Sequence, residues 1–573
     1  MFTLAPLPDT TVDFKTWTWE QIQPYYDELA SRPLDASNIE QWLRDWTHLG
    51  ELLTESYSRL STAVDLNTTD KEAETAFFNF LDTIDPKMRA AEQKLKEKLL
   101  ASKLEPKGFE IALRNIRSDA EIFRDENLPL FTQVTKLGKE YDRIKGAQTV
   151  NWDGEELTVY QLQKYVVSPD RAIREKAWRG KMERNLQDRQ ALNELWTKML
   201  PLRWQIAKNA GFASFRDYVW RTYYRFDYTP DDCLRFHDAI EKTVVPAVNR
   251  LVERKRQLFK IETIRPWDVD SHMNVDPLNR PSLKPYGSIA ELESKAANIF
   301  NYVDPELGEE FEAMRRGNLL DLENRKGKAP GGYCTSFNRE RRPFIFMNAV
   351  GLHDDVQTLL HEAGHSFHVF ETAHLPYIQQ LDVPMEFCEV ASMSMELLAQ
   401  PYLTNDKGGF YTSADAARAM SEHLEGMLFF WPYMAIVDAF QHWVYTSGEA
   451  ALDPAACDAK WGELSERFMG YQDWSGLEDI KVTGWHRKLH IYQVPFYYIE
   501  YGLAQLGAAQ VWANSLKSQA DATAAYRRGL ALGGTKALPE LFATAGAKLA
   551  FDADTLGQSV ELIESTLNKL HAM

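Results

Sequence analysis

The sequence predicts a mainly α-helical protein with one small β-sheet. Apolar residues recur at helical spacing over much of the chain, as in the stripe formed by Ile39, Trp42, Leu43, Trp46, Leu49 and Leu53. Only one pair of segments, 333–337 and 344–347, has the composition of convincing paired strands. A chain of 573 residues also exceeds the size at which single hydrophobic cores stop growing, so we expect two or more lobes.

Local signals predict the first elements of the chain. Residues 37–40 have the form of a capping box at the start of the apolar stripe. A helical stretch over 71–104 is expected to break at the Asp-Pro pair of 85–86, because proline lacks a hydrogen-bond donor and clashes with the preceding turn. The Asp-Gly pair at 153–154 indicates a small hairpin, and 168–170 have the form of a cap before the next helix.

The two expected strands flank a charged turn, 338–342, as in a hairpin with a solvent-facing edge. An exposed edge strand can bind an extended peptide as an additional strand, and Gly331 and Gly332 would let that backbone come close. The residues alone are equally compatible with an ordinary turn.

Charge and hydropathy argue against two classes of partner. The formal net charge of -18 disfavours nucleic acid and anionic membranes, because both attract basic surfaces. The most apolar run, 427–440, contains Pro432 and Asp438 and is too short to span a bilayer, so we expect a buried core helix. We therefore expect no nucleic-acid partner and no membrane partner.

The N-terminal segment and the cysteine usage indicate a cytoplasmic protein. Residues 1–8 lack a basic region and a continuous apolar run, so we expect no secretory signal. The chain has four cysteines and no C-x-x-C pair, which fits a reducing compartment. Cys388 is interpreted as a small buried residue rather than as a metal ligand or nucleophile.

The segment 361–368, His-Glu-Ala-Gly-His-Ser-Phe-His, has the spacing of a zinc-hydrolase motif. In a helix, His361 and His365 lie one turn apart on one face, so both imidazoles can reach one Zn²⁺ ion at about 2.0–2.1 Å. Glu362 lies beside them, in the position of the general base in H-E-x-x-H metallopeptidases. Apolar residues recur at helical spacing around these polar groups, which supports the helix.

Catalytic zinc takes three protein ligands, so a third ligand is expected downstream. His368 is two turns from His361 and lies too far along a rigid helix to share the ion. Glu389 and Glu396 lie seven residues apart on one face of a second expected helix, so one can bind the ion and the other can support a ligand. We predict that His361, His365 and Glu389 bind one Zn²⁺ ion per chain.

These motifs resemble those of the thimet oligopeptidase superfamily, and more closely those of its oligoendopeptidase F branch. Members carry H-E-x-G-H-x-x-H and, further downstream, a glutamate ligand in an E-x-A-S-like setting, which here is 389–392. Segments 327–335 and 343–348 resemble the family's glycine loop and the strand beside its substrate cleft, and 490–501 resembles its His/Tyr segment. The similarity is clearest from about Gly211 to the end of the chain.

The resemblance implies roles that the residue patterns alone leave open. His490 and Tyr497 are expected to stabilise the transition state, with Tyr498 and Tyr501 as near alternatives. Tyr501 and the glycine pair at 331–332 are expected to bind the substrate.

The resemblance also implies a two-lobed helical ellipsoid, with a deep internal substrate channel and the small β-sheet beside the zinc helix. We accordingly expect 1–200 to form an N-terminal helical lobe and 201–573 to form the zinc metallopeptidase catalytic region. A deep channel would restrict the substrates to short unfolded peptides.

We predict a zinc-dependent oligoendopeptidase that hydrolyses internal bonds of short peptides. The zinc ion would lower the pKa of a water toward about 7, and Glu362 would accept the proton. One alternative is a zinc carboxypeptidase on a related helical scaffold, which would release single C-terminal residues. The other is a catalytically silent peptide-binding protein. The sequence leaves the oligomeric state open.

Overall fold

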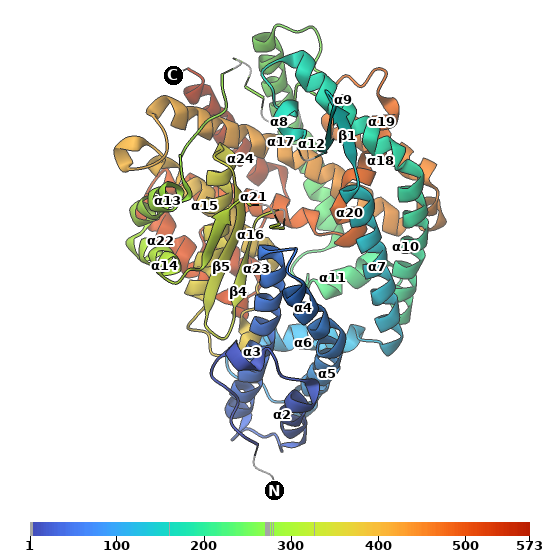
Figure 1. Ribbon diagram of the computed structural model, residues 1–573, viewed down its shortest axis with the longest axis vertical. Coiled ribbons are helices and arrows are strands. Elements are labelled where there is room, and N and C mark those ends of the chain that lie inside the picture. The colour runs from blue at the N-terminus through green and yellow to red at the C-terminus, as the bar shows by residue number, and fades with distance from the viewer. Residues whose placement is uncertain are drawn as a thin grey trace. The chain divides into compact units, whose positions relative to one another are not determined.

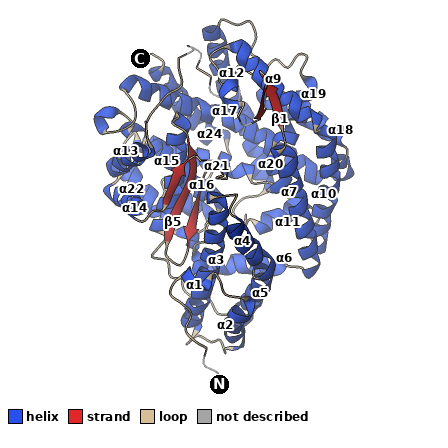
Figure 2. Cartoon of the chain, in the orientation of Figure 1, coloured by secondary structure: helices blue, strands red, loops and turns tan. Residues whose placement is uncertain are grey.

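Helices dominate the structure, a computed structural model, and the strands form two small sheets (Figure 1; Figure 2). The structure describes residues 4–159, 161–269, 275, 276, 278, 280–325, 327–329 and 331–572. The predicted mainly α-helical fold with a small sheet is therefore confirmed.

The chain divides into two compact units, each of which is assembled from three segments. Unit 1 comprises Met1–Glu121, Leu283–Ala416 and Gly507–Leu549, and unit 2 comprises Ile122–Ser282, Ala417–Leu506 and Ala550–Met573. The boundary expected at residue 200 divides the chain into two continuous regions. The two units cannot be separated by one boundary, because their segments alternate along the chain.

Unit 1 contains N-terminal helices, a three-stranded sheet and the helices that pack around it. Its elements are α1 Thr11–Phe14, α2 Trp19–Ser31, α3 Ile39–Leu66, α4 Lys71–Thr83, α5 Asp85–Ser102, α6 Glu110–Ile122, α13 Ile289–Val303, α14 Pro305–Arg316, β3 Leu320–Glu323, β4 Tyr333–Phe337, β5 Arg342–Ala349, α15 His353–Glu371, α16 Met385–Leu398, α22 Gln519–Leu530 and α23 Leu538–Thr544.

Unit 2 is helical apart from one hairpin. Its elements are α7 Leu128–Gly146, β1 Thr149–Trp152, β2 Glu155–Thr158, α8 Gln163–Val166, α9 Arg171–Gln187, α10 Arg189–Asn209, α11 Phe215–Thr222, α12 Pro230–Phe259, most of α17 Ser413–Thr446, α18 Pro454–Met469, α19 Glu478–Val482, α20 Leu489–Gln493, the start of α21 Tyr498–Ser515 and α24 Ala553–Leu570.

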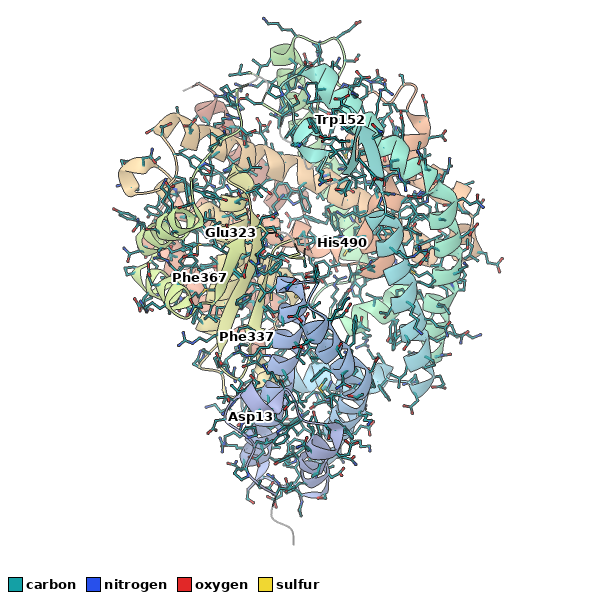
Figure 3. The ribbon with its side chains drawn as sticks, in the orientation of Figure 1. Asp13, Trp152, Glu323, Phe337, Phe367 and His490 are labelled. Atoms are coloured by element: carbon teal, nitrogen blue, oxygen red, sulfur yellow. The ribbon has the colours of Figure 1, made fainter. Side chains whose placement is uncertain are left out.

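The sheet of unit 1 has the strand order β3-β5-β4, with α15 packed against β4 and β5 (Figure 1). β4 and β5 pair antiparallel, as predicted, and β4 is an edge strand. Glu323 at the end of β3 and Phe337 at the end of β4 lie toward opposite ends of the sheet (Figure 3). The sequence did not indicate β3, a four-residue strand that pairs parallel with β5 and so lacks a hairpin signal.

Most of the local predictions in the N-terminal region are confirmed. The helical stretch breaks at Ile84, directly before the Asp-Pro pair, and β1 and β2 pair antiparallel around Asp153 and Gly154. The Asp170 carboxylate accepts hydrogen bonds from the backbone of α9 at Ala172 and Ile173.

The capping box predicted at 37–40 is wrong, because the polar side chains of this turn bind elsewhere. α3 begins at Ile39, and its N-cap Asn38 makes no side-chain capping bond. Asn38 Oδ1 instead accepts a hydrogen bond from the Asp35 backbone N–H at 2.9 Å, and Ser37 Oγ donates to the Asp35 carboxylate. The apolar stripe itself is buried, as expected for a core face.

The apolar run 427–440 lies inside α17, which continues through Pro432. Most of its side chains are buried, as expected for a core helix. Among the described helices, none combines the length and the hydropathy that crossing a bilayer requires.

Candidate active site

The two motif histidines lie on α15, whose N-terminus is fixed by Asp355. The backbone N–H groups of Val350, Gly351 and Leu352 all donate to Asp355 Oδ2, at 3.0, 2.8 and 2.7 Å. The hydroxyl of Tyr286 donates to the same oxygen at 2.6 Å. These bonds satisfy the polar groups at the helix start and fix the direction in which α15 leaves the sheet.

α16 contacts α15 at Gly364, which is why the motif has no side chain at this position. A Cβ atom on Gly364 would lie 2.6 Å from both the Ala391 oxygen and the Ser392 Cα. Both contacts are with backbone, which cannot move aside as a flexible side chain can. The sequence analysis did not identify this contact, although the run of small residues opposite it on α16 is a signal for close helix packing.

The close approach of the helices brings Glu389 of α16 to the two histidines of α15. Glu389 Oε2 lies 3.4 Å from His361 Nε2 and 3.8 Å from His365 Nε2. One donor atom from each of the three residues lies within 4.8 Å of the others. The structure thus brings together the three residues that the sequence predicts as metal ligands.

Two further side chains orient these donors. His361 Nδ1 lies 2.7 Å from Glu396 Oε1, so Nδ1 donates this hydrogen bond and Nε2 keeps its lone pair for a metal. Ser392 Oγ donates to Glu389 Oε2 at 3.2 Å. Of the two glutamates on α16, the predicted ligand Glu389 lies next to both imidazoles, and Glu396 bonds to the other ring nitrogen of His361.

Burial and neighbouring charge shift the pKa values of the cluster. Burial opposes the charged form of His361, but hydrogen bonds with Glu389 and Glu396 raise its pKa well above the ordinary value. Burial lowers the pKa of His365 to about 4. Burial is also the main cause that raises the pKa of Glu362 to about 7, which suits a group that must accept and release a proton near neutral pH.

The donor set fits a zinc ion. Two imidazole nitrogens and one carboxylate oxygen are a usual set for catalytic zinc and leave one coordination position open. The side chains of His361 and His365 remain 24% and 22% exposed, so this position can be reached.

A cavity of about 550 Å³ in unit 1 connects the cluster with the edge of the sheet. His365 and Glu389 line it together with Thr335 and Ser336 of β4. Its remaining lining residues include Val369, Ile378, Leu381, Asp382, Val383, Met385 and Cys388. The cavity is therefore lined by both polar and apolar side chains and lies against an edge strand.

His368, the third histidine of the motif, lies outside the donor set. It is buried, and its ring packs against Phe387 with centroids 5.9 Å apart. Burial lowers its pKa to about 3, so the ring stays neutral.

The His/Tyr segment is found in unit 2, where its rings gather at the junction of α20 and α21. The centroid of His490 lies 6.0 Å from that of Tyr497, 4.9 Å from that of Tyr498 and 6.2 Å from that of Tyr501. Tyr498 is buried and its hydroxyl accepts a hydrogen bond from Lys488 Nζ at 2.6 Å. Tyr497 and Tyr501 are only partly buried.

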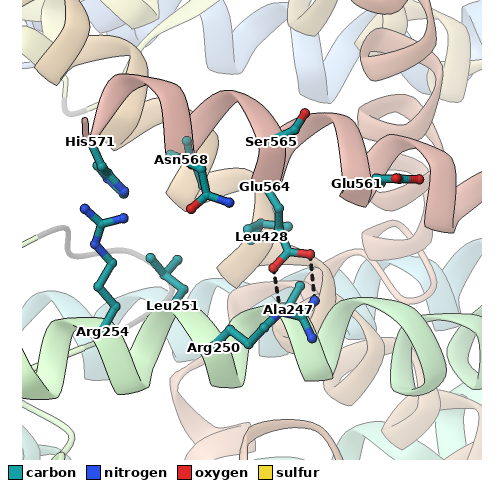
Figure 4. Close-up of a pocket in the computed structure, with 11 residues that line it drawn as sticks. Ala247, Arg250, Leu251, Arg254, Leu428, Glu561, Glu564, Ser565, Asn568 and His571 are labelled. Atoms are coloured by element: carbon teal, nitrogen blue, oxygen red, sulfur yellow. Dashed lines mark hydrogen bonds and ion pairs between the residues drawn. The ribbon is translucent and has the colours of Figure 1, made fainter. Parts of the chain in front are cut away.

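Unit 2 also contains a charged pocket between α12 and α24 (Figure 4). Arg250 and Glu564 form two hydrogen bonds there, at 2.8 and 2.6 Å, and Arg254 and His571 also line the pocket. The Arg250 side chain is 61% exposed, so this pair has the properties of a surface ion pair.

Two histidines and a glutamate on adjacent helices, with a second glutamate after the first histidine, define the class of helical H-E-x-x-H metallopeptidases. The comparisons with known proteins place the chain within this class. It belongs to peptidase family M3, whose model matches residues 165–560, and a model of the peptidase M3 N-terminal domain matches residues 10–123. The membership expected from the motifs is therefore confirmed, and this family consists of zinc metallopeptidases.

Similar proteins include oligoendopeptidases. The chain is 23% identical over 330 residues to the chromosomal oligoendopeptidase F of Lactococcus lactis subsp. cremoris, which covers 57% of this chain and 52% of that protein. It is 25% identical over 295 residues to the oligopeptidase PepF of Bacillus subtilis strain 168, which covers 49% of this chain and 40% of that protein. The match thus spans about half the length of these curated relatives.

A solved structure extends the similarity to nearly the whole chain. The structure of PZ peptidase A with inhibitor 2 is 27% identical, with a TM-score of 0.87, and covers 96% of this chain and 97% of that one. The two proteins therefore share the fold of both units.

Proposed function

We propose that this chain is a zinc-dependent oligoendopeptidase that hydrolyses internal bonds of short peptides. The observation that carries this proposal is the convergence of donor atoms from His361, His365 and Glu389 within 4.8 Å, with Glu362 next in sequence to the first of them. The similarity to proteins named oligoendopeptidase F and oligopeptidase supports the substrate class.

Glu362 is proposed as the general base and, later, the general acid. When bound, zinc supplies Lewis acidity, which polarises a peptide carbonyl and makes a water more acidic. The Glu362 carboxylate would accept a proton from the attacking water and pass it to the leaving amine. The backbone of Cys334 on β4 favours the charged form of this carboxylate and so lowers its pKa, against the larger effect of burial.

β4 is proposed as the strand along which the peptide binds. It is an edge strand, and its Thr335 and Ser336 line the same cavity as His365 and Glu389. An extended peptide paired with this edge would lie alongside the metal ligands. Gly331 and Gly332 precede the strand and are exposed.

Gly331 also has a backbone conformation that favours glycine. Its φ is +100°, and a Cβ atom there would meet no heavy atom within 4 Å. A side chain at this position would therefore strain the backbone and occupy the open space in which a peptide would lie.

His490 and Tyr497 are proposed as donors that stabilise the oxyanion of the transition state. Their partly exposed rings support this role, and Tyr501 is proposed as a substrate-binding residue for the same reason. Tyr498 is the weaker alternative, because its hydroxyl already accepts a hydrogen bond from Lys488.

We also propose a cytoplasmic location. All four cysteines are free thiols, which supports a reducing compartment. The deep channel between two lobes and the division of the chain at residue 200 remain predictions.

The proposal is tested by incubating the purified protein with a mixture of short peptides, with and without a zinc chelator, and identifying the products by mass spectrometry. Internal cleavage that stops with chelator and returns with zinc is expected. Release of single C-terminal residues would instead indicate a carboxypeptidase, and tight peptide binding without products would indicate a binding protein.

A matched variant tests the role of the base. Glu362→Gln keeps the size and the hydrogen-bonding capacity of the side chain but removes the basic group. We expect the variant to bind one equivalent of zinc at the site of His361 and His365 and to lose about 10²–10⁴ in kcat. Turnover near the wild-type rate would refute the proposed role.

A further inference from the structure

A second cluster of metal-ligating side chains lies in unit 2, on helices that the proposed reaction does not use. Cys233 and His237 lie one turn apart on α12, and Asp438 and His442 lie one turn apart on α17. Each pair has the i, i+4 spacing that places two side chains on one helix face. The same spacing holds His361 and His365 on α15.

The four side chains meet in a fully buried place. Their exposed fractions are 0% for Cys233, 1% for His237, 0% for Asp438 and 3% for His442. One donor atom each from Cys233, Asp438 and His442 lies within 4.8 Å of the other two. Trp220 and Phe496 pack around the His442 ring, with centroids 5.7 and 5.2 Å away, so the surroundings are aromatic and dry.

Polar atoms of this cluster lack the hydrogen bonds that burial demands. Among the described residues, none is a hydrogen-bond partner of Asp438 Oδ1 or of His442 Nδ1. Asp438 Oδ2 lies 2.9 Å from His237 Nε2 and 3.2 Å from His442 Nε2. Buried polar groups are otherwise almost always satisfied, so one carboxylate oxygen and one imidazole nitrogen without a hydrogen bond indicate that a partner able to accept their lone pairs is missing.

The spacing of the donors is compatible with a zinc site. His442 Nε2 lies 3.2 Å from Asp438 Oδ2, compared with 3.4 and 3.8 Å between Glu389 and the imidazoles of the candidate active site. Ligands that bind zinc tetrahedrally at about 2.0–2.3 Å lie roughly 3.3–3.8 Å from one another. A small adjustment of the side chains would therefore accommodate the ion.

We propose that Cys233, Asp438 and His442 bind a second zinc ion that joins α12 to α17. A thiolate, an imidazole and a carboxylate are all usual zinc ligands, and the thiolate disfavours calcium and magnesium. His237 donates a hydrogen bond to Asp438, as carboxylates that bind metals usually receive from a neighbour. Binding would release the thiol proton of Cys233 to solvent.

The ion has a structural role, because the site is closed to solvent and to substrate. It would also fix the loop before α21. The residue next to His442, Gln441, accepts a hydrogen bond from the Phe496 backbone N–H at 2.8 Å, and Phe496 itself has φ of +63°. Zinc at His442 would thus stabilise the strained turn that precedes Tyr497.

The thiolate ligand allows a test that separates this site from the first one. The full chain is produced in medium supplemented with cobalt, its metal content is measured, and its near-ultraviolet spectrum is recorded. Cobalt bound to His361, His365 and Glu389 has no sulfur ligand, so a thiolate-to-cobalt charge-transfer band reports the second site alone. We expect two cobalt equivalents per chain and this band.

Variants assign the band to its ligands. Cys233→Ser should lose the band and one metal equivalent, whereas Cys457→Ser, at another cysteine that is 0% exposed, should keep both. His361→Ala should lose one equivalent and keep the band. If Cys233→Ser does not fold, the wild-type protein and His361→Ala still decide the question. One equivalent without a thiolate band in the wild-type protein, or a band that persists in folded Cys233→Ser, overturns the proposal.

Discussion

Replacement of Gly364 by alanine should weaken metal binding without touching a ligand. The new Cβ atom would lie 2.6 Å from backbone atoms of Ala391 and Ser392, whereas ordinary contact begins at 3.4 Å. α15 and α16 would have to separate by about 0.8 Å, because neither partner is a side chain that can rotate away. Glu389 is on α16 and both histidines are on α15, so the separation acts directly on the distance between the ligands.

The displacement can be compared with what a zinc site tolerates. Ligand distances that hold zinc well lie within about ±0.2 Å of their usual values, so a shift of about 0.8 Å is several times too large. We expect zinc affinity to fall by at least about 10–100-fold, the loss typical of disturbed supporting residues. Overpacking should cost about 1–3 kcal/mol in the free energy of unfolding, offset by up to about 1 kcal/mol from the helix propensity of alanine.

The assay is competition for zinc between the protein and a chromophoric chelator, together with chemical denaturation of each variant. Gly426→Ala is the matched control, because Gly426 is also inside a helix and a Cβ atom there would meet nothing within 4 Å. The control should keep its zinc affinity and gain up to about 1 kcal/mol in stability. Unchanged zinc affinity in Gly364→Ala would refute the argument that contact between the two helices sets the ligand geometry.

Three further predictions concern Glu396, the His/Tyr segment and the buried His486. Glu396→Gln should lower zinc affinity about 10–100-fold in the same competition assay, because the imidazole it orients would lose its charged partner. Tyr497→Phe should reduce kcat about 10²–10³-fold with stability preserved, whereas Tyr498→Phe should mainly lose stability; the reverse pattern would exchange their roles. Burial lowers the pKa of His486 from 6.5 to about 3, so the unfolded chain binds one more proton and stability is lost as pH falls from 6.5 toward 3. His486 should contribute up to about 1.4 kcal/mol per pH unit to the slope of stability in that window, beside the contributions of His365 and His368. In urea unfolding, His486→Asn should reduce the slope and His374→Asn, at an exposed histidine, should leave it unchanged.

Much of the fold could be predicted from local patterns in the sequence. The helix break before the Asp-Pro pair of 85–86, the hairpin around Gly154 and the strands on both sides of the 338–342 turn depend on residues close together in the chain. β3 could not be predicted in this way, because its parallel partner β5 is more than twenty residues away and no turn connects them directly. The capping box at 37–40 failed because Asp35 competed for the same polar side chains.

In the candidate site, too, the features that depend on nearby residues could be predicted and those that depend on distant contacts could not. The helical spacing of His361 and His365 is local, and Glu389 could be inferred from the need for a third ligand. The contact at Gly364 is not local, since it depends on how two helices cross. The second cluster escaped the sequence analysis for this reason: each of its helices supplies only two donors, and the pairs are some two hundred residues apart in the chain.

Exposure assigns different roles to the two clusters, although their architecture is the same. In both, an i, i+4 pair on one helix meets donors from a second helix. The histidines of the first cluster are 22–24% exposed, and His365 and Glu389 line a cavity beside an edge strand, so a substrate can reach an open coordination position. The residues of the second are at most 3% exposed and packed among aromatic rings, so an ion there can only hold helices together. If both ions bind as proposed, the zinc at His361, His365 and Glu389 should leave readily with a chelator, and the zinc at Cys233 should leave only when unit 2 unfolds.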